Sequence, residues 1–153
     1  MAGEADHITL ANKNHAALEL LCKSGDYPEW VTTIAFYKAV HIVEAVFAYQ
    51  LGRHSNGHDD RLEQLKSKKF QPLFTHFRPL YCASLVARYL VDFGPAKLGQ
   101  GRSAPQYKTF TDYMPTEKVM KSLVQKRLRS IEDNAVSLLS EAAKSSMVRC
   151  VQS

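Results

Sequence analysis

Hydrophobic residues recur every three or four positions along most of the chain, which is the spacing of an amphipathic helix. The first segment of this kind covers about residues 9–23, and Gly25 stands where the end of a helix favours glycine. The second covers about 26–51, with Pro28 in its first turn and Gly52 just beyond its end. The pattern therefore predicts two long helices joined by a short turn.

Further helical segments follow these two. The spacing predicts a short helix over about 58–67 and a longer one over about 72–91, with a kink or break just before Pro79 because proline removes a backbone donor. A last helix is predicted over about 115–144. No run of alternating β-branched residues indicates a strand. We therefore expect an all-α protein, an antiparallel four- to five-helix up-and-down bundle with one long loop before the last helix.

The chain of 153 residues is long enough for one hydrophobic core. We expect a single domain over 9–145, a flexible N-terminus over 1–8 and a flexible tail over 146–153. The long loop, over about 92–114, contains glycine and proline but no clear period. A loop of this length in a compact domain is usually functional or disordered.

The composition, 45 % hydrophobic and 23 % charged, is that of a soluble globular protein. The net charge of +5 permits an acidic partner such as nucleic acid without requiring one. The three cysteines lie far apart without a CxxC pair, which favours free thiols in a reducing compartment over a disulfide framework or a zinc–thiolate site. The first residues lack the basic start and apolar run of a signal peptide. We therefore expect a cytoplasmic protein without a cofactor.

The most hydrophobic window, residues 31–51, has the length of a membrane span. It nevertheless contains Lys38, His41 and Glu44, and ionisable groups near the centre of a bilayer are costly. We therefore predict that this segment is the buried central helix of a bundle that does not contact a membrane.

One polar stripe interrupts this apolar helix. At spacings of four, four and three residues it comprises Thr33, Tyr37, His41 and Glu44. This spacing places all of them along one helical face. The histidine and the carboxylate could form an acid/base cluster, or the stripe could be an internal hydrogen-bonded network that joins this helix to the one over 72–91. The sequence leaves both interpretations open.

A second polar segment, residues 53–61, follows this helix directly. His54 and His58 have the HxxxH spacing that suits a metal on a helix, with Asp59 as a third candidate ligand. Asn56-Gly57 lies between them and is a turn signal, which argues against a shared helical face. We therefore predict no metal site, and His58 or Asp59 can instead cap the helix that follows.

A further pattern is scattered over roughly residues 10–140. It consists of Pro28-Glu29-Trp30, Ala35-Phe36-Tyr37, His41, Glu44-Ala45, His58-x2-Arg61, Leu80-Tyr81, Ser84 and Ala87-Arg88-Tyr89. In these positions the chain resembles the HEPN superfamily of small helical domains. The resemblance implies a four- or five-helix up-and-down bundle that is often dimeric. Many HEPN proteins are ribonucleases, including toxins of toxin–antitoxin and phage-defence systems.

The resemblance also implies a kind of site. Catalytic members carry an R-x4–6-H motif whose arginine and histidine come together across a dimer interface and act without a metal, and Arg53-x4-His58 has this spacing. Arginine would stabilise the charged phosphorane, and histidine would transfer protons with the ribose 2′-OH as nucleophile. The candidate catalytic residues are His58, Arg53, Arg88 and His41. The candidate substrate-binding residues are Arg61, Tyr37, Glu44, Tyr89, Arg102 and Lys108.

Arg88 has two interpretations. A buried or half-buried arginine requires a carboxylate or phosphate partner. Pairing with Glu44 would make it structural, whereas a position beside His41 and His58 would make it a phosphate ligand. The basic residues of the long loop, Arg102 and Lys108, could bind a single strand together with nearby tyrosines or form a solvated face.

We therefore predict a HEPN-like protein that binds or cleaves RNA, as a toxin or defence-system component. Its expected partners are a second copy of itself, RNA or a nucleotide, and an antitoxin-type protein. If it is an enzyme, it is a metal-independent endoribonuclease. The alternatives are a non-catalytic homodimeric protein–protein interaction module and a nucleotide-binding domain.

Overall fold

The computed structural model describes residues 2–92 and 105–150, and within them every regular element is helical apart from an isolated β-bridge between Val91 and Gln106. The all-α fold predicted from the sequence is confirmed. The elements are, in order, α1 (Glu4–Ser24), α2 (Pro28–Leu51), α3 (His58–Leu65), η1 (Lys68–Phe70), α4 (Gln71–Tyr89), α6 (Phe110–Tyr113), α7 (Thr116–Lys118), η2 (Val119–Leu128), α8 (Arg129–Ala135), η3 (Val136–Leu138) and α9 (Glu141–Ser146).

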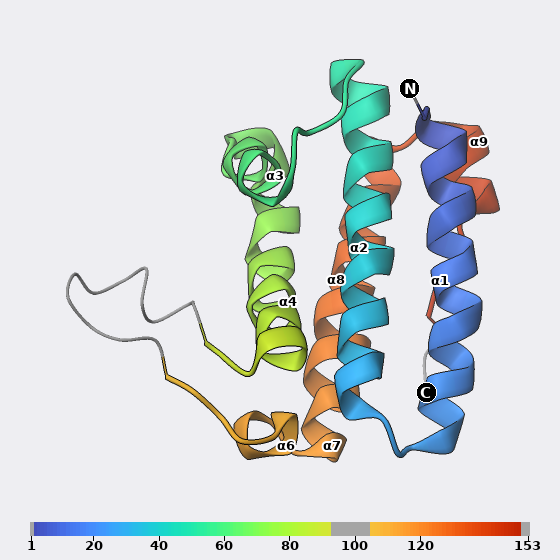
Figure 1. The fold of residues 1–153 in the computed structure, drawn as a ribbon. Coiled ribbons are helices and arrows are strands. Elements are labelled where there is room, and N and C mark those ends of the chain that lie inside the picture. The colour runs from blue at the N-terminus through green and yellow to red at the C-terminus, as the bar shows by residue number, and fades with distance from the viewer. Residues whose placement is uncertain (1, 93–104, 151–153) are drawn as a thin grey trace.

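The long helical segments lie side by side (Figure 1). In this view α1 runs downward, α2 upward, α4 downward again, and the segment from α7 through α8 upward, so that successive long segments are antiparallel. α3 lies across the upper end of α4, and α6 and α7 lie at the lower end. The short turn between α1 and α2 begins at Gly25, whose left-handed backbone (φ +72°) suits glycine.

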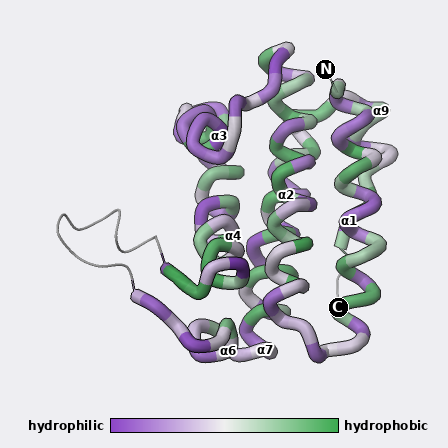
Figure 2. Tube along the Cα trace, viewed as in Figure 1, coloured by the Kyte–Doolittle hydropathy of each residue, from purple (hydrophilic) through white to green (hydrophobic). Residues whose placement is uncertain are grey.

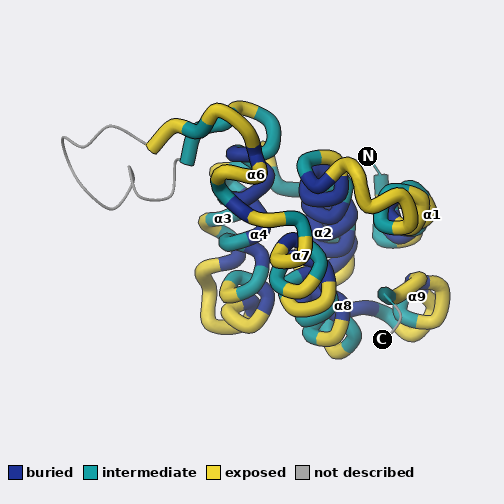
Figure 3. The backbone as a smooth tube through the Cα atoms, turned by 90° about the horizontal axis from the view of Figure 1, so that it is seen from below, coloured by how far each residue is buried: buried dark blue, intermediate teal, exposed yellow. Residues whose placement is uncertain are grey.

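α2 is the central helix of the bundle. Viewed from below, it is the buried helix between α1, α4 and α8 (Figure 3). Its apolar residues point to all sides, and Phe36, Ile42 and Phe47 are all excluded from solvent. Burial of a side chain of this size stabilises the fold by roughly 1.5–3 kcal/mol. By length and composition α2 could cross a membrane, but most of its apolar stretch is buried among the other helices.

α3 is the polar exception among these helices. Hydrophilic residues dominate its eight positions, as its colouring shows (Figure 2). Only Arg61 and Leu65 are buried. Leu65 anchors α3 to the core, and Arg61 therefore carries a guanidinium into the interior, where it needs an anionic partner.

The last helical segment differs from the single helix predicted over 115–144. Its middle part, η2, is a π-helix. The buried residues of η2 are Val119, Leu123, Val124 and Leu128. The five-residue step from Leu123 to Leu128 exceeds the α-helical period and suits the wider π turn. The helix then ends because Leu139 is extended (φ −104°, ψ 158°), and Ser140 begins α9 by accepting a hydrogen bond from the Ala143 N–H.

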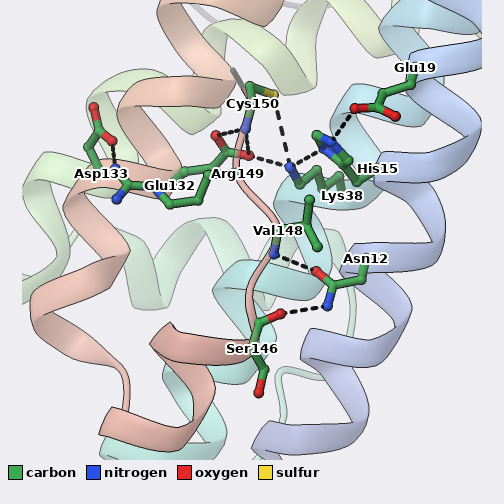
Figure 4. A network of polar contacts seen from close by, with 10 residues as sticks. All are labelled: Asn12, His15, Glu19, Lys38, Glu132, Asp133, Ser146, Val148, Arg149 and Cys150. Atoms are coloured by element: carbon green, nitrogen blue, oxygen red, sulfur yellow. Dashed lines mark hydrogen bonds and ion pairs between the residues drawn. The ribbon is translucent and has the colours of Figure 1, made fainter. Parts of the chain in front are cut away.

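Both ends of the chain that were predicted to be flexible carry ordered contacts. α1 begins at Glu4 instead of residue 9. Beyond α9, the residues up to Cys150 run beside α1 (Figure 4). There the Asn12 amide bonds the Ser146 carbonyl at 2.9 Å and the Val148 N–H at 2.8 Å. The tail is thereby held against the first helix.

Two other details differ from the sequence-based expectations. α4 continues through Pro79 without a break. α2 begins at Pro28, after Tyr27, two residues later than the start predicted at about 26. Of the loop predicted over 92–114, residues 93–104 lie outside the described part of the chain, and Phe110–Tyr113 forms α6.

Candidate functional site

The buried carboxylate of Glu44 is the centre of a hydrogen-bonded network at the upper end of α2. It accepts hydrogen bonds from Arg61 Nε at 2.8 Å, from the Ser55 N–H at 3.1 Å and from the Ser55 hydroxyl. Burial acts to raise the pKa of the Glu44 carboxyl, but the Ser55 hydrogen bonds and the Arg61 guanidinium hold it below its ordinary value. Glu44 therefore stays ionised and ties α3 and the preceding loop to α2. Its partner is Arg61, and not Arg88.

His58 begins α3 and contacts the same arginine. Its Nδ1 lies 2.8 Å from Arg61 Nη1, and its ring packs against Phe36 and Tyr81 with centroid separations of 5.6 and 5.5 Å. Because a guanidinium only donates, Nδ1 accepts and the proton of neutral His58 is on Nε2. Burial, followed by the charges of Arg61 and Arg88, lowers the pKa of His58. His58 is therefore neutral at pH 7 and presents an Nε2–H donor.

Arg88, on α4, lies among aromatic rings. Its guanidinium carbon is 5.5 Å from the centroid of Phe36, 5.7 Å from that of Tyr37 and 5.4 Å from that of Tyr89. It donates to the Ser84 carbonyl and hydroxyl, both at 3.2 Å, and to the Tyr37 hydroxyl at 3.4 Å. Among the described residues, no carboxylate forms an ion pair with Arg88. Its positive charge is oriented but not neutralised.

These contacts bring together residues from α2, α3 and α4, which we call the Arg88 face: Tyr37, His58, Arg88 and Tyr89. Tyr89 is 59 % exposed, and the other three are half-buried. Just after Tyr89, Leu90 adopts a left-handed conformation (φ +59°) that is costly for a residue with a side chain. The backbone of 90–92 then pairs with that of 105–107 through hydrogen bonds of 2.9 Å. Residues 90–92 and 105–107 are therefore held together next to the Arg88 face.

His41 belongs to a separate chain of histidines. His7 Nδ1 lies 3.2 Å from His41 Nδ1, and His7 Nε2 lies 3.3 Å from His54 Nε2. His54 Nε2 also faces the Ala2 carbonyl, which only accepts, so that nitrogen carries a proton. The contact between His7 and His41 needs one donor and one acceptor nitrogen, which two neutral imidazoles supply.

The pKa values of these histidines are consistent with neutral imidazole rings. Burial, followed by the neighbouring histidines, lowers the pKa of His7, and burial together with Arg61 lowers that of His41. The sequence-based prediction of this cluster missed His7, because residues 1–8 were expected to be flexible. The signal for it was the histidine itself, which occupies a buried position of α1.

The three remaining predicted site residues, like His41, Glu44 and Arg61, do not belong to the Arg88 face. Arg53 is exposed, donates to the His54 carbonyl at 3.4 Å and lies 3.8 Å from the Asp60 carboxylate. Within one chain, Arg53-x4-His58 therefore does not form a contacting pair. Lys108 is exposed, and Arg102 lies outside the described residues.

A second polar cluster, which the sequence did not predict, surrounds Lys38 where α1, α2, α8 and the tail meet (Figure 4). Lys38 and Glu132 form an ion pair in which both side chains are 0 % exposed. Lys38 Nζ also lies 2.8 Å from His15 Nδ1 and 3.9 Å from Cys150 Sγ. The Cys150 N–H completes the cluster by donating to Glu132 at 3.0 Å.

The donor atoms of this cluster resemble a metal site in type and spacing. One ligand atom each of His15, Glu132 and Cys150 lies within 4.8 Å of the other two. Lys38 Nζ, however, already bonds the carboxylate and the imidazole and supplies the positive charge that a metal would bring. Burial above all raises the pKa of the Cys150 thiol to about 12, so it is not a ready thiolate ligand. We therefore assign no metal centre here.

No protein-family model, no curated protein and no solved structure matches this chain. Its function is therefore argued from the geometry of the residues described above.

Proposed function

We propose that this chain is a HEPN-like helical bundle that binds single-stranded RNA at the Arg88 face. The observation that carries the proposal is the half-buried Arg88 guanidinium, which is fixed by Ser84 and aromatic rings but has no carboxylate partner among the described residues. A preoriented cation of this kind suits a phosphate, which guanidinium groups bind through paired donors. The net charge of +5 favours the same class of ligand.

Three residues of the Arg88 face contact the RNA in this proposal, and Tyr37 orients Arg88 by accepting its hydrogen bond. Arg88 contacts a backbone phosphate, and the exposed ring of Tyr89 stacks on a base, as aromatic side chains do in proteins that bind single strands. The Nε2–H of neutral His58 donates to a phosphate oxygen or to a ribose 2′-OH. Buried Glu44 and Arg61 act indirectly, because they fix the position of His58.

The same geometry favours binding over cleavage. A general base needs a free lone pair, and the Nδ1 lone pair of His58 is directed at Arg61. Its Nε2 carries the proton, so neutral His58 is a hydrogen-bond donor in this arrangement. Arg53, the arginine of the R-x4–6-H spacing, contacts Asp60 instead of His58. Purified protein in EDTA is therefore expected to retain an RNA oligonucleotide intact, and cleavage that His58→Ala abolishes would instead establish a nuclease.

Titration of the ¹⁵N-labelled protein with a short single-stranded RNA tests the proposal directly. We expect the largest chemical-shift changes at Arg88, Tyr89 and His58. A duplex RNA of the same length should bind more weakly, because its bases are not available for stacking. Changes confined to other surfaces, or no changes at all, would contradict the assignment of the site.

A second candidate function, self-association, is favoured by exposed hydrophobic side chains near the α1–α2 turn. Leu20, Tyr27 and Trp30 are 71 %, 49 % and 56 % exposed. Large apolar groups gathered in one segment are typical of protein interfaces. We propose that this segment joins two copies of the chain. Analytical ultracentrifugation of the wild type and of Trp30→Lys tests this, and a monomeric wild type would contradict it.

A further inference from the structure

A cavity of about 420 Å³ lies between α1, η2, the first residue of α8 and the extended tail. Its lining combines apolar side chains with His15, Glu19, Gln125, Arg129 and the two thiols of Cys22 and Cys150. Sites for small molecules commonly measure about 300 to 1,000 Å³ and combine apolar walls with a few polar groups. This cavity has both properties, and the RNA-binding proposal uses none of its residues.

One wall of the cavity is apolar and comes from two helices. Leu18 projects from α1, and Met120 and Val124 project from η2. A π-helix places side chains differently from an α-helix and is frequently found at functional sites. Here it contributes two apolar side chains to one cavity wall. An aliphatic chain is the ligand part that fits such a wall.

The charges around the cavity identify the other end of the ligand. Glu19 is already bonded to His15 Nε2 at 3.1 Å. Burial raises the pKa values of the Cys22 and Cys150 thiols, so both sulfurs are uncharged near pH 7. Arg129 forms no ion pair with any described residue. The lining therefore carries one carboxylate, Glu19, which is 55 % exposed to water and already accepts from His15, and one cation without an ion pair among the described residues, Arg129.

Behind this lining lies the Lys38 cluster, which closes the inner side of the cavity. The three donors of the Lys38 ammonium face Glu132, His15 and Cys150, so it does not compete for an anion. Because Lys38 donates to His15 Nδ1, the other ring nitrogen of His15 carries the proton that bonds Glu19. Arg129, with the Gln125 amide beside it, remains as the group that can receive an anionic head.

We propose that this cavity binds a small aliphatic monocarboxylate, with its carboxylate on Arg129 and Gln125 and its chain against Leu18, Met120 and Val124. A carboxylate matches the paired donors of a guanidinium. This ligand site is independent of the Arg88 face, and either proposal can fail without the other.

Octanoate is the probe for this test, with octan-1-ol and octylammonium as chain-matched ligands of different charge. The ¹³C-methyl resonance of Met120 reports on occupation of the cavity. We expect octanoate to shift this resonance saturably and the other two ligands to bind at least about tenfold more weakly, since they lack the charge-assisted hydrogen bond. Equal binding of octan-1-ol, or an unperturbed Met120 methyl, would overturn the proposal.

Substitutions locate the site. Arg129→Gln should weaken octanoate binding about tenfold or more, whereas Lys126→Gln, which removes the same charge from an exposed neighbour outside the lining, should not. Val124→Trp should fill the cavity and abolish binding, and Arg129→Gln keeps the test decisive if that variant does not fold. Equal effects of Arg129→Gln and Lys126→Gln would reduce the interaction to non-specific charge attraction and refute the site.

Discussion

Lys38 on α2 and Glu132 on α8 form an ion pair from which solvent is fully excluded at both side chains. His15 of α1 and the backbone of Cys150 complete its hydrogen bonds, so the pair joins three helices and the tail (Figure 4). Taking two charges out of water is costly, and the cost is offset only where the geometry satisfies both groups. A buried pair of this kind adds little net stability, but loss of one partner leaves an uncompensated charge in the interior.

The first prediction concerns that pair. Lys38→Met alone should lower the free energy of unfolding by about 3–5 kcal/mol, because it leaves the Glu132 carboxylate buried without its cation. The double variant Lys38→Met/Glu132→Leu should recover most of that loss. Urea unfolding followed by circular dichroism measures both. Lys66→Met, at an exposed surface pair, is the control, and a single variant no worse than this control would refute the buried pair.

The second prediction concerns acid stability. His7, His41 and His58 have pKa values below the ordinary 6.5, with burial as the leading cause. The folded protein therefore binds fewer protons than the unfolded chain near pH 6, and the free energy of unfolding should fall as the pH drops through 6.5 and below. Urea unfolding at pH 7.5, 6.5 and 5.5 measures this slope.

One variant tests whether the histidine contacts around His7 contribute to this pH dependence of the unfolding free energy. His41→Asn removes one titrating ring, so the difference in unfolding free energy between pH 7.5 and 5.5 should be smaller than in the wild type. His76, whose pKa burial also lowers, remains in both proteins and cancels in the comparison. An unchanged pH dependence in the variant would show that the His41 ring is not held in its neutral form.

The third prediction concerns base stacking. Tyr89→Leu should weaken binding of a single-stranded RNA by about 1–3 kcal/mol, the usual contribution of one stacked base. Tyr49→Leu is a matched control, because Tyr49 is 52 % exposed against 59 % for Tyr89 but lies outside the Arg88 face. Isothermal titration calorimetry measures both variants. Equal losses would argue for diffuse binding over the whole surface.

Much of the fold was predictable because its signals are local. Gly25 and Gly52 end α1 and α2 as expected, both in the left-handed conformation that favours glycine. The π-helix was not predicted, although the five-residue step between Leu123 and Leu128 already departs from the α-helical period. Periodicity identified a helix there but not the width of its turns.

The site was predictable as a location but not as a set of pairs. Tyr37, His58, Arg88 and Tyr89 do converge, yet the partner of Glu44 is Arg61, and His41 faces His7. Lys38 and Glu132 are 94 positions apart, and spacing along the chain carries no information about such a contact. Which buried charge finds which partner depends on tertiary packing.

In the proposed RNA complex, Arg88 binds the phosphate, and the arginine of the Arg53-x4-His58 spacing does not. Fluorescence anisotropy with a labelled single-stranded RNA, at one fixed salt concentration, compares Arg88→Gln with Arg53→Gln, two variants that each lose one positive charge. Arg88→Gln should weaken binding about tenfold or more, since a hydrogen bond to a charged group contributes about 1.5–3 kcal/mol, and Arg53→Gln should leave binding nearly unchanged. Full affinity in Arg88→Gln, or an equal loss in Arg53→Gln, would contradict the account.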